Sequence, residues 1–187
     1  METHYEQLLE RSNLNLSRIK ELEKLPQEQL ARQETPKKWS IIQVIDHLNK
    51  VYDLYEPNFK KELDLAPALN ENKQKVQHTL LGRLSIYSMK PKGQKRRFKM
   101  KTFDFFEPTA AAKAIDVIEE YTKKKDTFNG FIKAARMKNL NDRKMPTALG
   151  EKMKFYVAEC FDFILAHEER HMVQIEKLLV YREAEVD

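Results

Sequence analysis

At residues 148–181 the chain reads ALGEKMKFYVAECFDFILAHEERHMVQIEKLLVY, and this stretch decides the expected fold. Its apolar residues recur at steps of three or four, which is the spacing of one face of an α-helix. The stripe consists of Met153, Val157, Cys160, Ile164, His167, His171, Ile175 and Leu178. A helix with such a stripe buries it against other helices. The pattern therefore predicts one long last helix over residues 148–181 and a helical bundle around it.

Two histidines interrupt this apolar stripe, in the string HEERH. His167 and His171 are four residues apart, so on a helix their imidazoles share one face about 6 Å apart along the axis. A buried imidazole with no partner costs on the order of 1–3 kcal/mol, and one metal ion would satisfy both. Glu168 has the position of the glutamate in the HExxH motif, but Glu176 points off this face and no acidic third ligand follows. A zinc protease is therefore not expected.

A third inward histidine is expected on an earlier helix. Ser40 and Gln43 have the spacing of a capping box, and apolar residues then step along one face over residues 40–63, with His47 on that face. Three imidazoles from two helices can supply nitrogen ligands at about 2.0–2.1 Å and leave other coordination positions open to water or substrate. We therefore predict one divalent metal ion, held by His47, His167 and His171.

Two further helices complete the expected bundle. Thr3 and Glu6 form a second capping-box pattern, which begins a helix over residues 3–25, and Thr109 opens another over residues 109–137. The connection over residues 64–108 is far longer than is usual between packed helices. It is expected to hold a short extra helix near residues 76–87 and an extended strip over residues 99–106.

The fold class that follows is all-α, a four-helix bundle with a long crossover between its second and third helices. The length of 187 residues fits a single domain over 1–187. A hydrophobic fraction of 41% argues against disorder, and a count of only four glycines argues against a fold rich in tight turns.

Composition gives few hints of a special compartment or partner. The 34 basic and 29 acidic residues leave a net charge of +5, a mild excess that serves solubility. The single cysteine, Cys160, excludes an intrachain disulfide. The first twenty residues lack the apolar core of a signal peptide, and no apolar stretch is long enough to cross a bilayer. A cytoplasmic protein with no membrane partner is expected.

The order of these signals resembles the DinB-like superfamily, which includes the bacillithiol transferases and the mycothiol-dependent maleylpyruvate isomerases. Trp39-Ser40 begins the second helix and His47 follows; a long crossover then leads to HEERH and Gln174, and the run Leu149-Gly150 is also similar. The resemblance covers nearly the whole chain. It implies a four-helix bundle in which the three histidines hold zinc or nickel in a pocket at one end, and it makes a homodimer plausible.

Two glutamines are candidates to orient the ligands. Gln43 is one turn before His47, and Gln174 is about one turn after His171, so each could hold an imidazole in its metal-ready tautomer. The alternative is that Gln43 only caps its helix and that Gln174 only borders the apolar stripe.

Other residues have simpler interpretations. Cys160 is about 10 Å along the axis from His167, too far to be a ligand, and is expected in the core. Trp39 is expected to anchor the end of the bundle more than to serve as a substrate platform. His4 and His78 have no partners at ligand spacing.

Three functions stay open. The first is an enzyme that activates a small thiol or water on the ion, either to transfer the thiol to a small-molecule substrate or to hydrolyse one. The second is a non-catalytic protein in which the ion only closes the bundle. The third, least favoured, is a nucleic-acid or other anionic-partner module that uses the basic run Lys90, Lys92, Lys95, Arg96, Arg97, Lys99 and Lys101.

Overall fold

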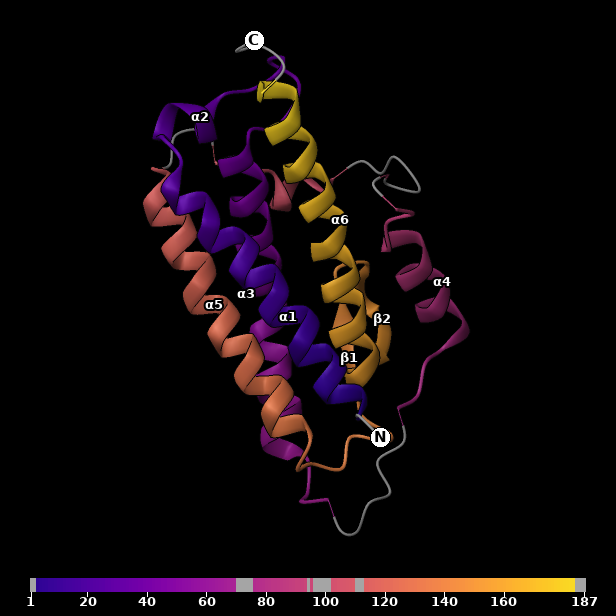
Figure 1. Cartoon of the computed structure of the whole chain (residues 1–187). Coiled ribbons are helices and arrows are strands. Elements are labelled where there is room, and N and C mark those ends of the chain that lie inside the picture. The colour runs from indigo at the N-terminus through magenta and orange to yellow at the C-terminus, as the bar shows by residue number, and fades with distance from the viewer. Residues whose placement is uncertain (1–2, 70–75, 94, 96–101, 110–112, 184–187) are drawn as a thin grey trace.

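Four long helices lie side by side in the computed structural model, which describes residues 3–69, 76–93, 95, 102–109 and 113–183, with side chains to residue 180. They are α1 (His4–Glu21), α3 (Ile41–Leu65), α5 (Ala114–Ala135) and α6 (Val157–Glu183) (Figure 1). Aromatic rings from three of them meet in the core, where Phe59 stacks on Phe161 at 4.3 Å between ring centroids and Phe128 contacts both. The predicted four-helix bundle is confirmed.

The direction of the helices explains the long crossover. In Figure 1, α3 and α5 run the same way, and α1 and α6 run the opposite way. The chain must therefore return along the length of the bundle between α3 and α5. Its return carries α4 (Leu80–Met89), which packs against α6 outside the bundle. The short extra helix in the crossover is thus confirmed.

The predicted helix starts were correct where a capping box marks them. The Thr3 hydroxyl accepts from the Glu6 backbone N–H while the Glu6 carboxylate accepts from that of Thr3, and Ser40 and Gln43 make the same exchange. A 3₁₀ helix (Leu22–Lys24) follows α1, and the short helix α2 (Gln27–Ala31) lies in the next stretch. The 3₁₀ helix lies at the end of the helix predicted over residues 3–25, and α2 lies in the connection that the sequence left unassigned.

Two predicted boundaries in the crossover were wrong. Thr109 does not open a helix, because α5 begins at Ala114 with Lys113 as its N-cap; residues 110–112 lie outside the described part. The strip over residues 99–106 is not extended along its whole length, since Phe103 is extended but Asp104–Phe106 forms a 3₁₀ helix. Residues 99–101 are outside the described part.

The largest correction concerns residues 144–156, which form a β-hairpin. Strands β1 (Lys144–Thr147) and β2 (Gly150–Tyr156) pair antiparallel, so Met153 lies on a strand and α6 starts only at Val157. Gly150 has φ +117°, which favours a glycine and a turn. Met153 and Val157 are four residues apart, which is also the spacing of about one helical turn, so the sequence pattern predicted a helix here. The small sheet is an addition to an otherwise helical fold.

The crossover helix is attached to the bundle through one buried carboxylate. Glu159, fully buried, accepts hydrogen bonds from the Thr79 backbone N–H at 2.8 Å, the Thr79 hydroxyl at 3.1 Å and the Tyr156 N–H at 3.1 Å. Gly82 packs directly on this carboxylate, and a Cβ at Gly82 would overlap it. Glu159 thus joins the start of α4, the end of β2 and the start of α6.

Gly82→Ala is expected to destabilise the protein by about 1–3 kcal/mol, because the displaced Glu159 loses buried hydrogen bonds. Gly130→Ala is the matched control, since a Cβ at Gly130, inside α5, meets nothing within 4 Å. It should stabilise by about 0.5–1 kcal/mol through helix propensity. Urea unfolding of both variants measures the difference. Equal effects of the two changes would show that the contact between Gly82 and Glu159 contributes nothing.

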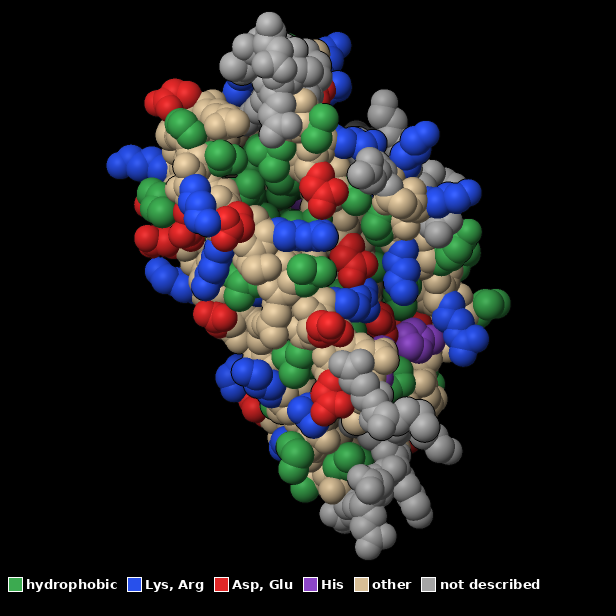
Figure 2. All heavy atoms as spheres, viewed as in Figure 1, with side chains coloured by type: hydrophobic (Ala, Val, Ile, Leu, Met, Phe, Trp, Pro, Cys, Tyr) green, Lys and Arg blue, Asp and Glu red, His purple; other side chains and the backbone are tan. Residues whose placement is uncertain are grey.

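None of the described helices is long and apolar enough to cross a bilayer. On the face shown in Figure 2, acidic and basic side chains are interleaved over the helices. Cys160 is buried, as predicted.

Candidate metal centre

The structure brings the three predicted ligands together. His47 comes from α3, and His167 and His171 from successive turns of α6. The Nε2 atom of His167 lies 3.3 Å from that of His47 and 3.2 Å from that of His171. One ligand atom from each residue lies within 4.8 Å of the other two. In the part of the chain that the structure describes, no other group of this kind was found.

Hydrogen bonds on the far side of two rings fix which nitrogen faces the cluster. Nδ1 of His47 lies 3.0 Å from the backbone carbonyl oxygen of Phe106, and Nδ1 of His171 lies 3.2 Å from Oε1 of Gln174. A backbone carbonyl oxygen and a side-chain amide oxygen can only accept hydrogen bonds. Each Nδ1 therefore carries the proton, and each Nε2 presents a lone pair. Both lone pairs are directed at His167.

His167 alone cannot satisfy both neighbours. A neutral imidazole donates only one hydrogen bond. An Nε2–H of His167 could therefore bond to the Nε2 of His47 or to that of His171, and the Nε2 lone pair of the remaining histidine would have no donor. Nδ1 of His167 is buried and has no hydrogen-bond partner among the described residues. A cation shared by the three Nε2 atoms would satisfy all of them. The arrangement therefore fits a metal ion better than a set of core histidines.

The spacing of the nitrogens supports the same conclusion. Two nitrogens that bind one ion at about 2.0–2.1 Å with a tetrahedral angle lie about 3.3 Å apart. The two Nε2 separations here are 3.3 and 3.2 Å. The three imidazoles can thus bind one ion with little movement.

Burial keeps the cluster in the form that binds metal. Desolvation lowers the pKa of His47, although its hydrogen bond to the Phe106 carbonyl opposes this. The pKa of His167 falls to about 3, through desolvation first and then the charges of His47 and Arg170. Desolvation also lowers the pKa of His171 well below its usual value. Neutral imidazoles are the species that coordinate metals.

The lowered pKa values of the three histidines predict that the metal-free protein loses stability as the pH falls. Below about pH 6.5 the unfolded chain binds protons on these histidines that the folded chain does not, so the free energy of unfolding falls as pH falls. Each histidine contributes up to about 1.4 kcal/mol per pH unit. The loss begins near the unfolded pKa and continues down to the lowered folded values.

Urea unfolding of chelator-treated protein between about pH 7 and 5 tests this. His167→Leu should flatten the pH dependence relative to the unchanged chain, since one of the titrating groups is gone. An identical slope in both proteins would contradict the expectation.

A cavity of about 680 Å³ opens on the cluster. Its walls combine α3 and α6 with three connections, at residues 34–39, 102–107 and 148–149. Trp39 lies in this wall, with its ring centroid 5.0 Å from that of His47 and 6.5 Å from that of His171, nearly parallel to the latter. Trp39 therefore packs on two histidines of the cluster, and its role is more than an anchor for the end of the bundle.

The two predicted orienting glutamines differ in what they contact. Gln174 lies against His171 Nδ1, as expected of a residue that fixes a tautomer. Gln43 Oε1 accepts from the Ser40 backbone N–H and from Gln33, both at 2.9 Å. Its observed contacts are those of a helix cap. The partner of His47 is instead the Phe106 carbonyl, which residue types could not reveal because it is a backbone atom.

His4 and His78 lie outside the histidine cluster and contact one carboxylate instead. Both Nε2 atoms lie 3.0 Å from Oδ2 of Asp162, and Arg11 lies 3.3 Å from Oδ1. The contact joins the start of α1, the approach to α4 and the second turn of α6. Sequence spacing missed it because the three residues lie far apart in the chain.

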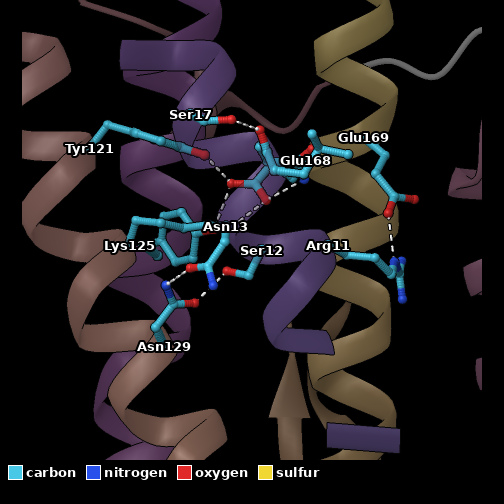
Figure 3. Close-up of polar contacts among 12 residues, drawn as sticks. Arg11, Ser12, Asn13, Ser17, Tyr121, Lys125, Asn129, Glu168 and Glu169 are labelled. Atoms are coloured by element: carbon cyan, nitrogen blue, oxygen red, sulfur yellow. Dashed lines mark hydrogen bonds and ion pairs between the residues drawn. The ribbon is translucent and has the colours of Figure 1, made fainter. Parts of the chain in front are cut away.

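Glu168 belongs to a buried polar network inside the bundle (Figure 3). Its carboxylate accepts from Lys125 Nζ at 2.5 Å, Asn15 Nδ2 at 2.8 Å and the Tyr52 hydroxyl at 2.8 Å, and also from the Tyr121 hydroxyl. Desolvation, with Glu168 nearby, raises the pKa of both tyrosines well above the usual value. Glu168 therefore serves the core, and the HExxH type of chemistry has no base here.

The fold and site together define a helical bundle with a buried cluster of three histidines that can hold one metal ion. A family model described as the DinB superfamily matches residues 10–175. The chain belongs to the DinB superfamily. No curated protein and no solved structure matches it.

Proposed function

We propose that the protein is a metal-dependent enzyme in which His47, His167 and His171 hold one zinc or nickel ion and a small molecule reacts in the adjoining cavity. The observation that carries this proposal is the convergence of three Nε2 atoms beside a cavity of about 680 Å³. A structural zinc site normally has four protein ligands, whereas a catalytic site keeps a position open. Only three ligand groups converge among the described residues.

A bound ion would act as a Lewis acid that lowers the pKa of a small thiol or of water. The chain supplies the remaining functions. Phe106 and Gln174 hold His47 and His171 in the tautomer whose Nε2 faces the histidine cluster. Trp39 and Phe163 give the cavity apolar surface, which excludes water from the reacting groups. We favour thiol transfer to an electrophilic small molecule, with hydrolysis as the other outcome.

The test begins with elemental analysis of gently purified protein and continues with turnover. Protein loaded with zinc or nickel is incubated with a small thiol and an electrophile, and thiol consumption and conjugate are measured. Cys160 is buried, so the protein's own thiol should contribute little to the signal. Metal-dependent conjugation, absent after chelation and in His167→Ala, is the expected result. Hydrolysis of an activated ester under the same conditions would favour water as the nucleophile.

The alternative function is that of a non-catalytic protein whose ion only stabilises the bundle. The same experiment distinguishes it from an enzyme. Bound metal that raises the unfolding temperature, with no turnover of any thiol or ester tested, would support that alternative. The third function, nucleic-acid binding, stays a prediction from the sequence, since Arg96, Arg97, Lys99 and Lys101 of the basic run lie outside the described residues. The cytoplasmic location and the homodimer stay predictions from the sequence.

A further inference from the structure

A short segment of the crossover, residues 102–109, lines part of the cavity and also supplies the hydrogen-bond partner of His47. We call this segment the strap. It contains the 3₁₀ helix Asp104–Phe106 and is otherwise without helix or strand. No ladder of backbone hydrogen bonds ties such a segment to α3, so side-chain contacts must fix its position. The place of the Phe106 carbonyl therefore depends on what holds the strap.

Two side chains of α3 hold the end of the strap. Asp46 and Lys50 are one helical turn apart, and Oδ2 of Asp46 accepts a hydrogen bond from the Thr109 backbone N–H at 2.7 Å. Nζ of Lys50 donates to the backbone carbonyl oxygen of Glu107 at 2.5 Å and to the Thr109 hydroxyl at 3.1 Å. The two side chains also pair with each other at 3.3 Å. These four contacts clamp residues 107–109 to the helix.

The clamp differs from an ordinary surface ion pair. The side chains of Asp46 and Lys50 are 13% and 27% exposed. Those of Asp64 and Lys60, which form a pair with the same spacing near the end of α3, are 64% and 69% exposed. Salt screens exposed pairs, and most contribute little. Asp46 and Lys50 are better shielded and each also contacts the backbone of the strap, so together they can fix its position.

The clamp acts on the residues that directly follow the partner of His47. Phe106 is buried, its ring packs edge-to-face on that of His47 with 5.8 Å between centroids, and its carbonyl oxygen lies 3.0 Å from Nδ1. A displacement of about 1 Å would take this oxygen out of hydrogen-bond range. The neutral ring of His47 could then carry its proton on Nε2, where the proton blocks coordination of a metal.

We propose that Asp46 and Lys50 are positioning residues of the metal centre. By holding the strap, they keep the Phe106 carbonyl against Nδ1 of His47 and so leave Nε2 free to bind the ion. Neither residue lines the cavity, so both act through His47 and not on the substrate. This proposal rests on the proposed function and adds two residues to its site. Because the strap also lines the cavity, the clamp joins the cavity wall to a metal ligand.

The tautomer of His47 in the metal-free protein gives the first test. Nitrogen-15 NMR distinguishes a protonated ring nitrogen from one with a lone pair, and the variant His47→Gln assigns the signals. Nδ1 of His47 should be protonated in the unchanged chain. Asp46→Ala and Lys50→Ala should move the proton partly or wholly to Nε2, whereas the matched control Asp64→Ala should not. A loss of stability alone would not change the tautomer of the folded chain.

Metal affinity gives the second test, with nickel titrated into each protein and followed by Trp39 fluorescence. Asp46→Ala and Lys50→Ala should each weaken binding by about 3–10-fold, because a direct partner of a ligand is worth about 10–100-fold and the clamp acts one contact further away. Asp46→Asn keeps an oxygen that can accept from Thr109, and Lys50→Arg keeps a donor, so each should recover much of the loss. Asp64→Ala should keep the affinity of the unchanged chain.

An unchanged tautomer together with unchanged nickel affinity in Asp46→Ala and Lys50→Ala would overturn the proposal. Equal changes in Asp64→Ala would overturn it as well, since they would reflect the loss of any ion pair on α3. If Asp46→Ala does not fold, Lys50→Ala decides. If nickel binds to none of the proteins, the unchanged chain included, the proposed function fails, and the tautomer measurement still shows whether the clamp orients His47.

Discussion

Glu168→Ala is expected to destabilise the metal-free protein by about 3–5 kcal/mol, because it leaves Lys125 buried without its counter-charge. Lys125 is fully buried, and its ion pair with Glu168 spans 2.5 Å between α5 and α6. The variant would also leave the hydroxyls of Tyr52 and Tyr121 without their shared acceptor. Urea unfolding at neutral pH measures the effect.

The double variant Glu168→Leu with Lys125→Met is the control for this prediction. Replacing both members of a buried ion pair with apolar residues is often close to neutral, whereas removing one member is not. The double variant should therefore be clearly more stable than Glu168→Ala, although Asn15 and the two tyrosines still lose a partner. A Glu168→Ala protein as stable as the unchanged chain would show that the network contributes little.

His167→Ala is expected to weaken metal binding by more than about 100-fold, since even a residue that only orients a ligand is worth about 10–100-fold. Trp39 provides the readout: it is the only tryptophan in the chain, and its ring centroid is 5.0 Å from that of His47. Copper or nickel bound to the cluster should quench its fluorescence, and the titration gives the affinity.

His78→Ala is the matched control, because it removes a histidine whose observed contact is with Asp162 and leaves the cluster intact. It should keep the affinity of the unchanged chain. Equal losses in both variants would mean that the ion does not bind at His47, His167 and His171.

Local signals in the sequence predicted local features well. The capping boxes at Thr3 and Ser40 set the starts of α1 and α3, because the groups that satisfy the first turn lie within three residues. The three histidines could be predicted because a polar residue on an apolar stripe must face the core. The spacing of four between His167 and His171 then placed both on one side of α6.

Features that depend on distant residues were not predictable. The start of α6 at Val157 depends on the hairpin that pairs residues 144–156, and the apolar spacing of that stretch suits either structure. The orientation of His47 depends on a backbone carbonyl 59 residues away, at Phe106. The contact of His4 and His78 with Asp162 likewise exists only in the folded chain.

Two kinds of segment line the cavity, and they differ in how well they tolerate mutation. The three histidines lie on packed helices of the bundle, whereas much of the wall comes from the connections at residues 34–39, 102–107 and 148–149. Connections tolerate substitution and insertion far better than packed helices do. Mutations in these three segments can therefore alter which molecule is accepted without repacking the core. For protein engineering, these segments are the place to build libraries for new substrates, with the bundle left unchanged.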